Sequence, residues 1–338
     1  MKKGKIIITS ILLGIMCTGG YKNACAAEVY TPRELVTNRI VNFDSNAFVE
    51  GNSIVTINNK ISKGKNKESK ISITFVSEEG NVTENVIKKK GEVIPIVWKD
   101  SRLYARSEKN KKITISIMDK KGKVEKTYSI KPKYENKAKI KKVAIYDLKV
   151  KGNKIYYLMR TADKKNNQKK YIQTYDIKKN KVVNSKNISV DDRYTYLGNS
   201  LYRCEYGKKC FIKEYSLDGK KLLNSYQLPC TKEDFIVDAH PWKNEYTTPY
   251  NFGGTVIKGK YIYLINKKGI FRLNKNKSNE FELIYDGSND NIFNPPLGEE
   301  LNMDNFGMFD NGDLYMLFAN YDNSILKNVI YKNSKNIE

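Results

Sequence analysis

The chain has 338 residues, of which 61 are Lys or Arg and 37 are Asp or Glu, giving a formal net charge of +24. A single histidine and only five cysteines argue against a zinc site, because such sites are built from clustered Cys and His ligands. No segment after the first 26 residues approaches the roughly 20 apolar residues of a membrane-spanning helix, so no transmembrane segment is expected.

Residues 1–26 are expected to be a secretory signal peptide. Three lysines precede an apolar stretch of 11 residues, residues 6–16, and the small residues Ala24-Cys25-Ala26 follow as a cleavage site. A lipid anchor on Cys17 or Cys25 is the alternative, but neither cysteine follows the Leu-(Ala/Ser)-(Gly/Ala) run that lipoprotein signals resemble. We therefore expect residues 27–338 to form one exported domain, secreted or held at the cell surface.

A short pattern recurs along the chain: a turn, then Ile or Leu followed by an aromatic residue. The copies are Ser101-Arg102-Leu103-Tyr104, Asn153-Lys154-Ile155-Tyr156, Asn199-Ser200-Leu201-Tyr202, Lys260-Tyr261-Ile262-Tyr263 and Gly312-Asp313-Leu314-Tyr315, after a degenerate Asn52-Ser53-Ile54-Val55. Internal repeats of this length predict an array in which each unit buries its apolar face against the next.

A second turn follows each pattern and contains Gly or Asn, which tolerate the positive φ of tight hairpins. Its versions are Glu78-Glu79-Gly80-Asn81, Asp119-Lys120-Lys121-Gly122-Lys123, Lys178-Lys179-Asn180-Lys181, Asp218-Gly219-Lys220-Lys221 and Asn274-Lys275-Asn276-Lys277. Two turns per repeat predict a meander of about four short strands. The Ile or Leu anchors, from Ile54 to Leu314, are six in number and lie 46 to 61 residues apart, which predicts six units.

These strand starts and turns resemble the six-bladed bacterial β-propellers of the TolB-like and NHL-like kind, from roughly residue 45 to the C-terminus. The resemblance implies an all-β ring of four-stranded blades and carries no catalytic information. It also implies that an N-terminal strand closes the ring, for which residues 38–48 are the candidate. The alternative is a β-sandwich over residues 45–135 followed by a shorter propeller.

The positive charge is uneven: residues 60–186 contain 36 Lys or Arg and 13 Asp or Glu, whereas residues 187–338 contain 19 and 20. Such asymmetry can attract an anionic polymer or surface. Because Lys outnumbers Arg by 53 to 8, we expect diffuse attraction rather than specific phosphate recognition. A purely compositional origin of the lysines is the alternative. Export and the lack of an RNA- or DNA-binding motif argue against nucleic acid.

Three cysteines remain after the expected cleavage. Cys204 and Cys210 flank five residues that are typical of a hairpin tip, so we expect a disulfide between them and a leftover thiol at Cys230. The alternative is three reduced cysteines that serve as small apolar residues.

Two insertions between repeats are long enough to hold a site, since loops between blades gather at one mouth of a propeller. The first supplies the candidate ligand-binding residues Asp238, His240, Trp242, Tyr246 and Tyr250. Its aromatic rings suit stacking on sugar or peptide groups, and its histidine is the type of residue that acts as a general base. No nucleophile motif accompanies that histidine, so a structural role for the whole group is the alternative.

The second insertion places oxygen ligands at alternate positions, Asp286, Ser288 and Asp290, as calcium loops do. The closing glutamate of an EF-hand is missing, and Asp and Asn are also the commonest turn residues. Calcium is accordingly the one cofactor that the sequence suggests.

With a scaffold signal and no catalytic constellation, the sequence predicts an exported, non-enzymatic binding propeller. Its expected partner is an anionic cell-envelope polymer or a surface protein. The alternative is a calcium-assisted propeller hydrolase or lyase that uses Asp238, His240, Asp286 and Asp290.

Overall fold

The computed structural model describes most of the chain after residue 29. The described residues are 30–34, 46–64, 66–109, 112–135, 139–190, 192–205, 207–230, 255–266, 268–277, 280–291, 293, 302–320 and 325–333. All regular structure among them is β, and none of them belongs to a helix long and apolar enough to cross a membrane.

The strands form six antiparallel sheets of four strands each, in which sequence neighbours pair. Given from the first strand to the fourth, blade 1 consists of β2 (Asn46–Glu50), β3 (Ser53–Ile61), β4 (Glu68–Ser77) and β5 (Val82–Lys90), and blade 2 consists of β6 (Val93–Lys99), β7 (Arg102–Lys109), β8 (Lys112–Met118) and β9 (Val124–Ile130). Blade 3 consists of β10 (Ile140–Lys151), β11 (Lys154–Asp163), β12 (Gln168–Asp176) and β13 (Lys181–Ile188), and blade 4 consists of β14 (Arg193–Leu197), β15 (Ser200–Glu205), β16 (Phe211–Tyr215) and β17 (Leu222–Gln227). Blade 5 consists of β18 (Thr255–Lys258), β19 (Tyr261–Asn266), β20 (Gly269–Asn274) and β21 (Glu282–Asp286), and blade 6 consists of β22 (Asn302–Met308), β23 (Leu314–Asn320), β24 (Ile325–Asn333) and β1 (Tyr30–Glu34).

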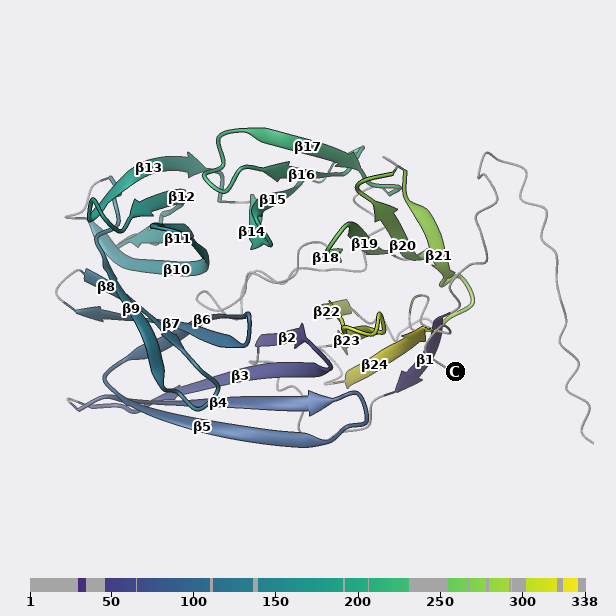
Figure 1. The fold of residues 1–338 in the computed structure, drawn as a ribbon, viewed down its shortest axis with the longest axis horizontal. Helices are drawn as coiled ribbons and strands as arrows, with labels where there is room; N and C mark the ends of the chain where they lie inside the picture. The colour runs from purple at the N-terminus through teal and green to yellow at the C-terminus, as the bar shows by residue number, and fades with distance from the viewer. Residues whose placement is uncertain are drawn as a thin grey trace, which may run out of the picture.

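The six sheets stand around a common centre, with the first strand of each sheet innermost (Figure 1). The chain is therefore a six-bladed β-propeller, and the expected fold and blade count are confirmed. The alternative of an N-terminal β-sandwich is wrong, because residues 46–130 form blades 1 and 2.

The ring is closed by β1, which pairs with β24 from Tyr30 opposite Asn333 to Glu34 opposite Val329. An N-terminal strand was expected to do this, but residues 38–48 were the wrong choice. The end of that segment instead begins β2, the innermost strand of blade 1.

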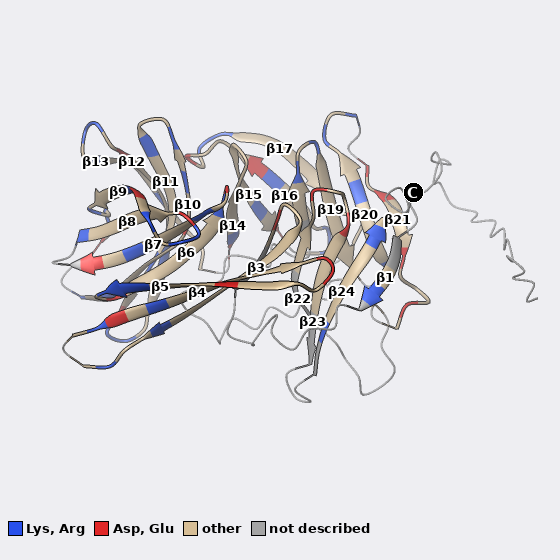
Figure 2. Cartoon of the chain, turned by 60° about the horizontal axis from the view of Figure 1, so that its bottom comes forward, with Lys and Arg blue, Asp and Glu red and all other residues tan. Residues whose placement is uncertain are grey.

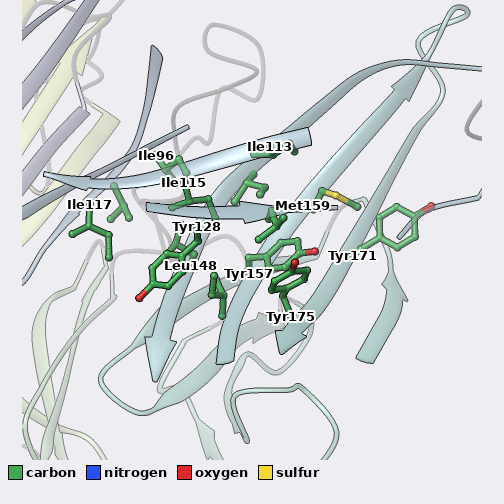
Figure 3. Close-up of a cluster of buried hydrophobic side chains, with 14 residues drawn as sticks. Ile96, Ile113, Ile115, Ile117, Tyr128, Leu148, Tyr157, Met159, Tyr171 and Tyr175 are labelled. Carbon is green, nitrogen blue, oxygen red and sulfur yellow. The ribbon is translucent and has the colours of Figure 1, made fainter. Parts of the chain in front are cut away.

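The hydrophobic core lies between the blades rather than within them. Each of the six junctions holds one cluster of buried side chains. The cluster between blades 2 and 3 is typical: Ile113 and Ile115 of β8 pack with Leu148 of β10 and with Tyr157 and Met159 of β11 (Figure 3). Burying one such side chain stabilises the fold by about 1.5–3 kcal/mol, so neighbouring blades depend on one another.

The repeated Ile/Leu–aromatic pair lies at the start of the second strand, and its two residues face different junctions because strand side chains alternate. In blade 4, Leu201 packs with Leu158 and Ile172 of blade 3, whereas Tyr202 packs with residues of blade 5. Three other pairs divide in the same way: Ile54 and Val55, Ile262 and Tyr263, Leu314 and Tyr315. All six anchors are fully buried, which explains why the pattern recurs.

Charged side chains of first strands tie blades 2, 3 and 4 together. Lys99 Nζ lies 2.6 Å from Asp147 Oδ1 and donates to the carbonyl of Tyr196 at 2.8 Å. Asp147 is fully buried and also accepts from Thr195 Oγ1 at 3.0 Å and from the Tyr196 amide at 2.7 Å. Its carboxylate thus joins blades 2, 3 and 4.

We expect Asp147→Ala to lower the free energy of unfolding by about 3–5 kcal/mol, because it leaves the Lys99 ammonium and the Tyr196 amide without their shared acceptor. Urea denaturation measures the change. Lys67→Ala is the control, since Lys67 and Glu92 form an ion pair with side chains 49% and 45% exposed, and should cost no more than about 1 kcal/mol. Equal losses in both variants would contradict the role assigned to Asp147.

Candidate functional site

The strand order gives the ring two different faces. Turns between strands one and two, and between strands three and four, lie on one face, which we call the turn face. Turns between strands two and three, and the connections from one blade to the next, lie on the opposite face, which we call the insert face. The two long insertions connect blades, and the described strand ends that flank them, at β17 and β18 and at β21 and β22, lie on the insert face.

The first insertion supplied the candidate ligand-binding residues Asp238, His240, Trp242, Tyr246 and Tyr250. All five lie outside the described residues, and their assignment stays a prediction.

The second insertion is described in part and bears on the proposed calcium loop. Asp286 Oδ1 accepts hydrogen bonds from the backbone amide of Ser288, at 2.9 Å, and from its hydroxyl group. Asp290 Oδ2 accepts from the hydroxyl groups of Tyr285, at 2.8 Å, and Tyr331, at 2.9 Å. Both carboxylates thus support the local fold, and no group of three or more His, Cys, Asp or Glu that could hold a metal occurs within the part of the chain described.

Cys204, Cys210 and Cys230 are buried thiols in the cluster between blades 4 and 5. The register of β15 and β16 places Ile212, not Cys210, opposite Cys204. Cys210 is therefore a diagonal neighbour, and diagonal pairs lie about 7–8 Å apart, beyond the usual separation of bridged cysteines. The register thus favours the alternative of reduced cysteines, while the Cys204–Cys210 bridge itself stays a prediction.

Thiol titration of the protein unfolded in denaturant without reductant tests this directly. We expect Cys204, Cys210 and Cys230 all to react, because all three are thiols in the structure and bridging Cys204 to Cys210 would require a shift of the β15–β16 register. A non-reduced peptide that joins Cys204 to Cys210 in mass spectrometry would contradict the structure.

The lysine-rich residues 60–186 lie in blades 1 to 3, where blue positions outnumber red ones in Figure 2. On the insert face several of these lysines have acidic partners. Lys67 Nζ lies 2.6 Å from Glu92, and Lys169 Nζ lies 2.6 Å from Glu135.

A different arrangement occurs on the turn face, at the turn between the third and fourth strands of blades 2 to 5. Exposed lysines occur at this turn in all four blades, and we call them the lysine rim. They are Lys120, Lys121, Lys123, Lys178, Lys179, Lys181, Lys220, Lys221 and Lys277. Within the described residues, none of these lysines forms an ion pair.

In the rim turns of blades 2 and 4, the acidic residue accepts hydrogen bonds from groups of the turn itself. Asp119 Oδ1 accepts from the amides of Lys121 and Lys123, both at 2.9 Å, and the Lys123 amide in particular lowers the pKa of Asp119. Asp218 Oδ1 accepts from Ser216 Oγ at 2.6 Å and from the Lys220 amide at 3.2 Å. The carboxylates are held inside the turns, which leaves the lysine side chains to face solvent.

The rim turns are also fixed to the preceding blade. A side-chain carbon at Gly122, where φ is +82°, would lie 2.6 Å from Ile87 of blade 1, and one at Gly219, where φ is +69°, would lie 2.9 Å from Ile172 of blade 3. Only glycine permits both the positive φ and this close approach. In blade 3, the Tyr175 hydroxyl group donates to the side chain of Asn180 in the same turn and to the Ser129 carbonyl of blade 2, at 3.1 Å.

Blade 4 contains a buried carboxylate beneath the rim. Glu214 Oε1 accepts from Ser200 Oγ at 2.6 Å and Tyr202 at 2.9 Å, and Oε2 accepts from Asn224 at 3.0 Å and Tyr226 at 3.1 Å. Burial by itself raises the pKa of Glu214, but these hydrogen bonds and the charge of Lys275 outweigh it, so the pKa is lowered. Lys275 Nζ lies 3.3 Å from the Tyr202 hydroxyl group and links blade 5 to this network.

Glu214→Gln should lower the free energy of unfolding by about 1–3 kcal/mol at pH 7, because the amide cannot accept all four hydrogen bonds. The pKa of Glu214 is lower in the folded state than in the unfolded state, where it is about 4.3. The charged carboxylate therefore stabilises the fold at pH values above the unfolded-state pKa, and this stabilisation is lost as the pH falls through the folded-state pKa. The difference in free energy of unfolding between the unmodified protein and Glu214→Gln should therefore become smaller in acid. Denaturation from pH 7 to pH 3 checks this, with the exposed Glu84→Gln as control; a constant difference would contradict the assignment.

No protein-family model matches the chain, and no curated protein matches its sequence. Similar solved structures include the β-propeller domain of the Trilobed protease from Pyrococcus furiosus, at 10% identity and a TM-score of 0.41, covering 91% of this chain and 84% of that one. Another is BamB from Moraxella catarrhalis, at 9% identity and a TM-score of 0.33, covering 90% and 100%. A third is an acylaminoacyl peptidase from Pyrococcus horikoshii, at 12% identity and a TM-score of 0.40, covering 81% and 42%. The six-bladed architecture rests on the strand pairing and not on these likenesses.

The lysine rim was not among the candidate sites predicted from the sequence. Its signal is nonetheless present there, since four of the five versions of the second turn contain lysines. Only the ring brings those turns to the same face.

Proposed function

We propose that this chain is an exported, non-enzymatic binding propeller that attaches to an anionic polymer of the cell envelope. The observation that carries the proposal is the set of nine exposed rim lysines without an acidic partner among the described residues. A surface with excess charge of one sign raises the local concentration of an oppositely charged polymer and speeds its association.

The signal-like N-terminus supports export, and hence a partner outside the cytoplasm. A surface protein with an acidic patch is the second kind of partner that fits the same chemistry. Nucleic acid fits less well, because an exported chain would meet it rarely.

The alternative is a calcium-assisted hydrolase or lyase that would need Asp238, His240, Asp286 and Asp290 to converge. Of these four residues, the structure describes Asp286 and Asp290. Asp286 bonds to Ser288, and Asp290 bonds to Tyr285 and Tyr331, so these contacts give the enzyme hypothesis no support. A loss of turnover in His240→Ala or after chelation, on any envelope substrate, would favour the enzyme over the binding protein.

Binding of the purified protein to envelope material should weaken as salt is added. Between about 0.05 and 0.5 M NaCl we expect the affinity to fall by at least about tenfold, because added ions screen exposed charges. Co-sedimentation with envelope fragments measures the bound fraction. Binding that persists unchanged in high salt would contradict the electrostatic part of the proposal.

A further inference from the structure

We propose that two copies of this chain associate through β17, the outermost strand of blade 4, which pairs antiparallel with β17 of the other copy across a two-fold axis. The proposal concerns a sheet edge and not the lysine rim. It does not depend on the proposed function.

Strand β17 is an exposed sheet edge without charge. It is the fourth strand of its sheet and lies at the outside of the ring (Figure 1), and no described strand pairs with its outer edge. Its residues are Leu, Leu, Asn, Ser, Tyr and Gln, and all but Tyr226 are exposed. Natural proteins protect such edges, most often with charged side chains, because an open edge can pair with another chain.

The other outermost strands carry the charges that β17 lacks. Among the six outermost strands that the structure describes, β17 alone contains no Asp, Glu, Lys or Arg. Blade 2 gives the clearest comparison, because β9 and β17 both have a bulge near their start. The bulged residue is Glu125 in β9 but Leu223 in β17, where Leu222 and Leu223 are 48% and 44% exposed. The protection found in blade 2 is therefore missing from blade 4.

The distribution of charge selects a second copy as the occupant of this edge. Each copy has a net charge of +24, and blades 1 to 3 contain nearly all of the excess, whereas residues 187–338 contain 19 Lys or Arg and 20 Asp or Glu. Two copies therefore repel each other least where blade 4 meets blade 4. A partner of strong opposite charge would be drawn to the lysines instead. The surface that matches an uncharged, partly apolar strand is an identical strand, and a two-fold axis pairs two such strands antiparallel.

The backbone of β17 has the groups for such a ladder. The Leu228 amide donates to the Cys210 carbonyl at 2.8 Å, and the same register pairs Tyr226 with Ile212 of β16. Because main-chain groups of a strand alternate in direction, those of Ser225 and Gln227 point to the outer edge. They are the groups that bond the second copy.

The antiparallel arrangement also separates the nearest lysines. Lys220 and Lys221 directly precede β17 at the turn face, so in the dimer they lie beside the insert-face end of the other β17 and not beside their own counterparts. The turn faces of the two copies point in opposite directions. A ladder of six residues buries less than the roughly 1,200–2,000 Å² of a standard interface, so we expect a weak dimer that forms as the concentration rises.

The test measures the dimer dissociation constant of the purified protein by sedimentation equilibrium, from micromolar to near-millimolar concentration. L223E introduces into β17 the charge that β9 has at its bulge, and V183E is the control, since Val183 is the bulged residue of β13 and is 42% exposed. S225K adds a second test with T127K as control, because Thr127 of β9 occupies the position of Ser225 in β17. Circular dichroism establishes that each variant folds.

We expect L223E and S225K each to weaken the dimer by about tenfold or more, because each places two like charges near the two-fold axis, and both controls to stay within about twofold. In hydrogen exchange, the β17 peptide of the unmodified protein should exchange more slowly at high concentration than at low concentration. Added salt should strengthen the dimer, because it screens the repulsion between two positive copies, whereas it should weaken polymer binding.

Three results would overturn the proposal. The first is a protein that stays monomeric over the whole concentration range in high salt. The second is a dimer that L223E and V183E, or S225K and T127K, weaken equally. The third is a dimer whose β17 amides are not protected from exchange, which would place the interface elsewhere.

Discussion

The fold depends on one constraint: the second strand of each blade must bury both of its faces. Leu201 contacts blade 3 and its neighbour Tyr202 contacts blade 5, so blade 4 cannot complete its core alone. Second-strand side chains of the other blades also alternate between the two flanking junctions, so each blade needs both of its neighbours to complete its core. The last junction, where Tyr315 meets Ile54, joins segments from opposite ends of the chain, and the pairing of β1 with β24 beside it completes the ring.

The junctions between blades also contain polar side chains that connect neighbouring blades. Asp147 and Glu214 are buried carboxylates, and each accepts hydrogen bonds from several neighbouring donors, which offsets the cost of burying a polar group. Lys258 links blades 5 and 6, because its ammonium group donates to the Phe309 carbonyl at 2.6 Å. These ties lie near the first turns of the blades, and they hold the turn face in a fixed shape.

In the function proposed above, a rigid turn face would let individually weak charges act as one binding surface. Single exposed lysines contribute little to affinity, because solvent and salt screen them. Lysines repeated at the same turn of successive blades would act together on an anionic polymer, since the ring sets the spacing of the turns. The ring thus gives the lysine rim a fixed spacing, which single exposed lysines do not have.

The repeats by themselves determined the all-β class, the blade count and the six buried anchors, because these depend on local alternation and turn chemistry. The closing strand was misplaced at residues 38–48, since the pairing of Tyr30–Glu34 with β24 spans almost the whole chain and leaves no local signal. The sequence predicts Asp290 as a metal ligand, which stays a prediction, and only folding brings the Tyr331 hydroxyl group to its carboxylate. The lysine rim likewise exists only in the ring, because turns about fifty residues apart share a face through the packing of blades and not through any nearby sequence.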